Sequence, residues 1–184
     1  MSDYTIPRPA AGDITDLIAD DHRLFEDLMR DMRDVSADRD GARSAFAAVL
    51  IAHSEAEEEV VYPKLVRRDV IEGEEEHHGE KEHAATNEAL LHLLQAKGTD
   101  TQKSQDALEA VAEVLNHHIG EEEQTILNPA REDASEELRQ QLGADWAARR
   151  NELLEDGAGS LEQVESLVKQ AYEDGLLPND DQPS

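Results

Sequence analysis

Two histidine–glutamate pairs with the same spacing stand out in this sequence of 184 residues. His53 precedes Glu57 by four residues, and His118 precedes Glu122 by the same interval. Residues four apart share one face of an α-helix, so each pair can present an imidazole and a carboxylate to the same point. Imidazole and carboxylate together suit iron, manganese or zinc. The repeated pattern therefore predicts two metal-binding helices.

Each pair follows another histidine, one predicted helical hairpin upstream. His22 lies on the apolar stripe of a predicted helix that begins after Asp13, and His83 lies on the stripe of a predicted helix over about residues 80–96. The apolar positions recur in steps of three and four residues, which is the helical period. A buried glutamate is rare unless it is paired or bound to a metal. One shared metal centre would therefore account for all four histidines and both glutamates.

Two other histidines are weaker candidates. His117 and Glu121 are also four apart, but their face of the helix carries smaller apolar residues than the face of His118. His117 is therefore expected on the solvent side or next to a ligand. His78 is a further candidate ligand, although it lies five residues before His83 and shares its face only if the helix is irregular there.

Composition limits the partners and the ligands. The formal net charge of −27 would repel nucleic acids and anionic membranes. There is no cysteine, so disulfides, iron–sulfur clusters and thiolate zinc sites are excluded, and nitrogen and oxygen must hold any metal. No apolar run is long enough to span a bilayer, and no signal-peptide pattern is present. These features favour a cytoplasmic protein.

The apolar periodicity predicts an all-α protein, with a four-helix bundle and one or two additional C-terminal helices. Residues 1–12 contain two prolines and no periodicity, and they are expected to form a flexible tail. The bundle is expected over residues 13–130 and a helical extension over residues 131–175, where no residue suggests chemistry. Residues 176–184 are expected to be disordered.

Caps and helix breakers indicate the boundaries. Asp13 is expected to cap the first helix, and the second is expected to begin near Ala42. Pro63 and Pro129 are expected near the ends of the second and fourth helices, with the alternative that the chain continues past Pro63 as a kinked helical turn through Leu65 and Val66. The charged segment DVIEGEEEHHG is expected to connect the second helix to the third.

These elements resemble the hemerythrin-like family of HHE cation-binding domains. The resemblance covers roughly residues 13–130 and lies in four segments that occur in the family's order, which are DDHRLF, HSEAEEEVVYP, KEHAATNEALLHLL and HHIGEEEQTILNP. It implies an up-down-up-down bundle around two iron ions with oxo or hydroxo and carboxylate bridges. By this resemblance Glu57 and Glu122 would bridge the irons, and the terminal ligands would be His22, His53, His83 and His118.

One position departs from the pattern of the family's oxygen carriers, which have two histidines four apart on the third helix. The residue four before His83 is Gly79 here, so one ligand is absent or is replaced by His78, Glu80 or water. A more open iron would favour peroxide or nitric oxide chemistry, or redox sensing, over reversible oxygen carriage.

The resulting hypothesis is a non-haem di-iron protein that binds dioxygen, nitric oxide or peroxide in oxygen or redox sensing, or in a stress response. One alternative is a di-iron enzyme that disproportionates peroxide or reduces nitric oxide, and another is an iron-storage or iron-handling protein. A metal- and oxygen-binding protein is favoured over a dedicated enzyme. The expected partners are a small diatomic ligand or peroxide and an electron-donor protein, with no nucleic acid and no membrane.

Overall fold

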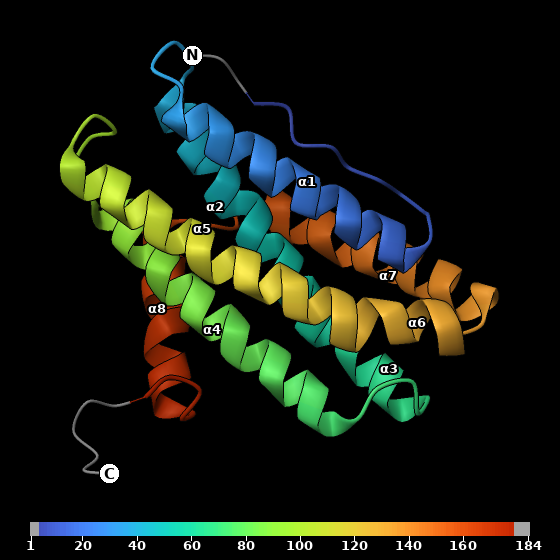
Figure 1. The fold of residues 1–184 in the computed structure, drawn as a ribbon. Coiled ribbons are helices and arrows are strands. Elements are labelled where there is room, and N and C mark those ends of the chain that lie inside the picture. The colour runs from blue at the N-terminus through green and yellow to red at the C-terminus, as the bar shows by residue number, and fades with distance from the viewer. Residues whose placement is uncertain (1–3, 179–184) are drawn as a thin grey trace.

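The computed structural model describes residues 4–178, which form helices and no strand. Four long helices make up the bundle (Figure 1), with α1 packed along α2, α4 along α5, and further contacts joining the two hairpins. Their bounds are α1 Ile14–Arg33, α2 Arg39–Ala56, α4 Gly73–Gln95 and α5 Gln102–Glu122. The predicted all-α bundle is confirmed.

Side-chain caps set where three of these helices begin. Asp13 caps α1, Asp38 caps α2 and Thr101 caps α5, each by accepting a hydrogen bond from a backbone N–H of the first turn. Such a cap satisfies one of the N–H groups that have no partner within the helix. The predicted start of the second helix near Ala42 is wrong because Asp38 caps it earlier, at Arg39.

The third long helix also begins earlier than predicted. The connection is shorter than predicted, because α4 begins at Gly73 and continues without a break to Gln95, which leaves only residues 69–72 of the charged segment outside the helix. Its first turn contains three consecutive glutamates, whose charges favour a helix N-terminus. His78 therefore lies in regular α-helix, five residues from His83 and on a different face.

A π-helical segment follows each histidine–glutamate pair. These segments are Glu57–Val61 and Glu123–Leu127, and they lead into the short helices α3 (Tyr62–Arg67) and α6 (Asn128–Asp133). The chain continues past Pro63 as a helical turn through Leu65 and Val66, which is the alternative that the sequence left open, whereas Pro129 does not mark the end of the fourth helix. Each proline occupies the first turn of the short helix that follows. Proline is tolerated there because its missing N–H would have no helical partner. Single π-helical turns are frequent at functional sites.

The two additional C-terminal helices are present, as predicted. α7 (Glu136–Glu155) packs against α1 and α2, and α8 (Leu161–Glu173) packs against α4 (Figure 1). The segment before α1 runs beside α7, where a Cβ atom at Gly143 would lie 1.8 Å from the Gly12 carbonyl oxygen. Only glycine permits this approach, so α7 and the N-terminal segment pack backbone to backbone.

The terminal residues 1–3 and 179–184 lie outside the described part, and with them most of the tail predicted at 176–184. Within residues 4–178, no helix is both long enough and apolar enough to cross a membrane.

Candidate metal centre

The structure brings the six predicted ligands together inside the bundle. Four helices each contribute one histidine, and the two glutamates lie where α2 and α5 pass into their π-helical segments. No member is more than 7% exposed. They form two groups, in each of which three candidate ligand atoms lie within 4.8 Å of one another: His22, His53 and Glu122; and Glu57, His83 and His118.

Both carboxylates contact histidines of both groups. Glu57 Oε1 lies 3.0 Å from His53 Nε2, and Glu57 Oε2 lies 3.3 Å from His83 Nε2. Glu122 Oε2 lies 3.2 Å from His22 Nε2 and 3.8 Å from His118 Nε2. The two groups therefore adjoin, and the carboxylates lie where they could bridge two metal ions.

Several atoms at this point are buried without a hydrogen bond. Nε2 of His22 and of His53, Oε1 of Glu57 and Oε2 of Glu122 are all inaccessible to solvent and have no hydrogen-bond partner. A buried polar atom without a partner is costly, and such atoms are rare in folded proteins. A cation coordinated by these lone pairs would remove that cost, so the donor set fits a metal centre.

Three of the histidines are oriented by a carboxylate on the other ring nitrogen. Nδ1 of His53 lies 3.1 Å from Asp21 Oδ2. Nδ1 of His83 lies 2.7 Å from Glu58 Oε1, and Nδ1 of His118 lies 3.0 Å from Glu82 Oε2. Metal-ligating histidines commonly donate this second N–H to a carboxylate, which fixes the tautomer and the ring orientation. This arrangement leaves Nε2 of each ring to face the centre.

The same carboxylates control protonation when no metal is bound. Burial alone would lower the pKa of His53, but the nearby negative charges of Glu57 and Asp21, together with the hydrogen bond to Asp21, raise it to about 10. Burial likewise opposes ionisation of Glu57, but His53 and His83 hold the pKa of its carboxyl well below the usual range. The raised pKa of His53 favours its protonated form in the metal-free protein, and metal binding to that imidazole must displace a proton.

Tyr62 lies beside Gly79, at the position where His78, Glu80 or water was the predicted replacement for a ligand. Its hydroxyl donates to Glu122 Oε1 at 2.9 Å and lies 3.3 Å from Glu57 Oε2 and 3.5 Å from His83 Nε2. Its ring is stacked on the imidazole of His83, with centroids 5.8 Å apart. Gly79 provides the space, because a Cβ atom there would lie 2.9 Å from Tyr62 Cε2.

Gly79→Ala is expected to destabilise the protein, although alanine normally stabilises a helix interior by about 1 kcal/mol relative to glycine. The added Cβ would clash with the buried Tyr62 ring. Overpacking of this kind lowers the free energy of unfolding by about 1–3 kcal/mol. Denaturant unfolding of the metal-free variant and the metal-free wild type shows whether the free energy of unfolding falls or rises. Gly120→Ala on α5 is the matched control, because its Cβ would meet no atom within 4 Å. This variant should be more stable than the wild type.

The C-terminal extension, for which no chemistry was predicted, closes the side of the centre near His53. Arg150 of α7 is fully buried, and its Nε and Nη2 donate to the two carboxylate oxygens of Asp21 at 2.6 and 2.7 Å. Trp146, one turn earlier, packs edge-on against the His53 ring at 5.6 Å between centroids. α7 thus both orients and covers one of the predicted ligands.

His78 is not brought into the buried groups. Its side chain is 51% exposed on the surface of α4, and its Nε2 lies 3.5 Å from Glu82 Oε1. His117 is also on the surface, with its side chain 69% exposed. Neither residue reaches the centre in this structure.

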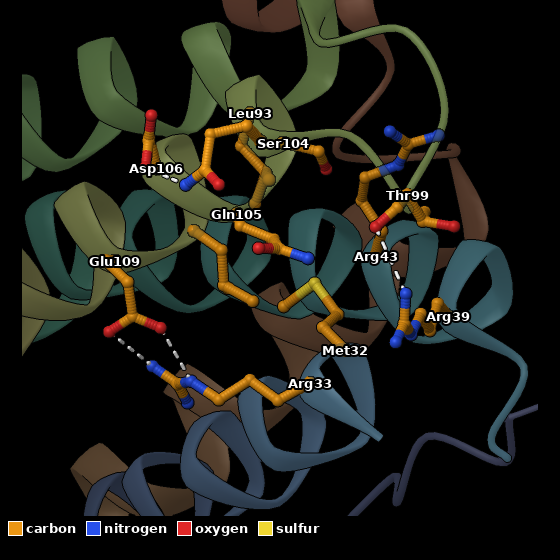
Figure 2. A pocket seen from close by; sticks show the side chains of 12 residues that line it. Met32, Arg33, Arg39, Arg43, Leu93, Thr99, Ser104, Gln105, Asp106 and Glu109 are labelled. Atoms are coloured by element: carbon orange, nitrogen blue, oxygen red, sulfur yellow. Dashed lines mark hydrogen bonds and ion pairs between the residues drawn. The ribbon is translucent and has the colours of Figure 1, made fainter. Parts of the chain in front are cut away.

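A cavity of about 300 Å³ lies elsewhere, between the C-terminal turn of α1 and the first turns of α2 and α5. Figure 2 shows Arg33 engaged by Glu109 and Arg39 by the Thr99 carbonyl. Glu109 and His118 are roughly two to three helical turns apart on α5, so the cavity is separate from the metal centre.

Comparison with known proteins agrees with this geometry. Residues 13–130 match a family model described as Hemerythrin HHE cation binding domain. A curated relative named DNA nickase, from Nostoc sp. (strain PCC 7120 / SAG 25.82 / UTEX 2576), is 27% identical over 143 residues. That alignment covers 76% of this chain but only 40% of the relative. No solved structure matches the chain.

Proposed function

The chain belongs to the hemerythrin HHE cation-binding domain family, and from this premise we propose that it is a non-haem di-iron protein that binds dioxygen or a related small ligand. The observation that carries the proposal is the pair of adjoining buried groups whose carboxylates reach histidines of both. His22 and His53 would hold one ion, His83 and His118 the other, and Glu57 and Glu122 would span them.

The surroundings suit chemistry that must exclude water. Two ferrous ions, when bound, supply the electrons for reduction of a small oxygen-containing ligand. Phe25 packs edge-on against His53 with ring centroids 5.1 Å apart, and Val49, Val111 and Leu115 on the ligand-bearing helices are fully buried. In the metal-free protein the Tyr62 hydroxyl donates a hydrogen bond to Glu122. The apolar side chains would keep solvent from the centre.

The relative named DNA nickase does not extend the proposal to DNA. This chain spans less than half of that protein's length, and its net charge of −27 opposes contact with a polyanion. The proposal is therefore confined to the metal centre.

Metal analysis of protein produced with iron tests the proposal, together with an optical spectrum in the oxidised, reduced and re-exposed states. About two irons per chain, with bands that bleach on reduction, are expected for a di-iron bundle. A single zinc, or no iron, would contradict it. Oxygen release from added peroxide in excess of the iron content would instead favour the peroxide-disproportionating enzyme.

Tyr62→Phe is expected to change the ferric spectrum while the iron content stays the same. We propose that the Tyr62 oxygen, placed among Glu57, Glu122 and His83, serves as the seventh ligand. A ferric phenolate absorbs visible light and phenylalanine cannot form one, so the variant should lose that band. Tyr172→Phe is the control, because that hydroxyl donates to Glu88 away from the centre. A visible band that persists in Tyr62→Phe would exclude ligation by Tyr62.

A further inference from the structure

Two surface histidines converge on one carboxylate between α4 and α5. His78 Nε2 lies 3.5 Å, and His117 Nε2 3.4 Å, from the same oxygen, Oε1 of Glu82. His78 and Glu82 are one turn apart on α4, and His117 comes from the facing helix α5. We call these three residues the outer cluster. None of them belongs to the two buried groups.

The environment of the shared oxygen, Glu82 Oε1, differs from that of an ordinary surface ion pair. Glu82 Oε1 is inaccessible to solvent and has no hydrogen-bond partner, although the whole side chain is 11% exposed. The two imidazoles that approach it are exposed, so they can rotate to share a cation with it. Two imidazoles and one carboxylate suit a first-row divalent metal ion, with water completing the coordination.

Glu82 also connects the outer cluster to the buried centre. Its other oxygen, Oε2, lies 3.0 Å from Nδ1 of His118, whose Nε2 faces the centre. The buried groups are almost wholly closed to solvent, so a metal ion needs a route between helices to reach them. The strongly negative protein surface concentrates cations and speeds their association.

We propose that His78, Glu82 and His117 form an outer metal site that captures a divalent first-row cation and passes it to the buried centre. The capture step stands on the cluster itself, whereas the delivery step rests on the proposed function. A cation held at Glu82 Oε1 is separated from the inner ligand His118 by a single carboxylate. Rotation of that side chain would open the path between α4 and α5.

A zinc titration followed by calorimetry tests the capture step. The wild-type chain is expected to bind one more zinc ion than the His78→Ala/His117→Ala double variant. His77→Ala is the matched control, since His77 is the exposed neighbour of His78 and its Nδ1 lies 3.4 Å from Glu80 instead. Equal zinc stoichiometry in the wild type and the double variant would overturn the outer site. This comparison does not depend on whether the buried centre takes iron.

The rate of ferrous iron uptake by metal-free protein tests the delivery step. The double variant is expected to fill about tenfold more slowly, at the low end of the rate gain that local charge and steering provide, but to reach the same iron content. His77→Ala should fill at the wild-type rate. Unchanged kinetics in the double variant would overturn delivery. Failure of every variant to take up iron would instead overturn the proposed function, with capture still decided by the zinc titration.

Discussion

A Glu122→Ala variant is expected to bind at most about one iron ion per chain instead of about two, and Glu57→Ala is expected to behave alike. Each of these carboxylates contacts histidines of both groups, so its removal takes a ligand from both proposed ions at once. Loss of a terminal histidine would weaken only one. Iron content after gel filtration measures the effect directly.

Folding must be separated from metal binding in this experiment. Glu122 is buried and accepts the Tyr62 hydroxyl, so alanine leaves that hydroxyl without its acceptor. Glu122→Gln keeps a carbonyl oxygen for Tyr62 but has no negative charge with which to bridge two cations. It should therefore fold as well as wild type, as judged by helical circular dichroism, and still fail to retain both ions.

Glu121→Ala is the matched control for the register of the helix. Glu121 is four residues after His117, which is the alternative pairing on α5, and it lies outside both buried groups. Iron binding should be unchanged in this variant. If Glu121→Ala lost iron while Glu122→Ala kept two ions, the assignment of the bridging residues would be wrong.

The helical period explains why the cluster could be predicted from the sequence. The six predicted ligands lie on the same stripes as the core residues, so the 3.6-residue period that predicts the bundle also places them inside it. Local spacing was sufficient because each histidine–glutamate pair belongs to one helix. That these residues bind iron remains a prediction.

Tyr62 could not be predicted in the same way. It lies five residues after Glu57, which is a poor same-face spacing in an α-helix, and the intervening π-helical turn alters its direction. Its place also depends on the missing side chain of Gly79 on another helix. The sequence showed that Gly79 stands where the family's oxygen carriers have a histidine. Which residue fills the space beside Gly79 is determined by packing in the folded protein.

The carboxylates that orient the histidines follow a rule that only the folded chain reveals. Asp21, Glu58 and Glu82 are each the chain neighbour of a predicted ligand, yet each contacts a histidine on a different helix. The position of each carboxylate next to a predicted ligand was therefore a usable signal in the sequence. Which histidine each carboxylate contacts could not be predicted in this way. Arg150 gave no local signal at all, since it is 129 residues from Asp21 in the sequence.

Arg150→Met is expected to lower the free energy of unfolding by about 3–5 kcal/mol, because it leaves the Asp21 carboxylate buried without its partner. It should also weaken iron retention by about 10–100-fold, because Asp21 would no longer be held against Nδ1 of His53. Denaturant unfolding and competition with a chelator measure the two effects. Arg149→Met, which removes a more exposed ion pair with Glu59, should cost only about 1 kcal/mol or less.

A double variant separates positioning of His53 from simple stability. Asp21→Asn combined with Arg150→Met removes the buried carboxylate charge that Arg150 no longer balances, so much of the lost stability should return. Iron retention should stay weak, because a neutral amide raises the basicity of His53 less than a carboxylate does. Arg150→Lys keeps the charge but not the two parallel hydrogen bonds, so it should recover affinity only in part. Recovery of full iron affinity in the double variant would show that α7 supports the fold and not the metal centre.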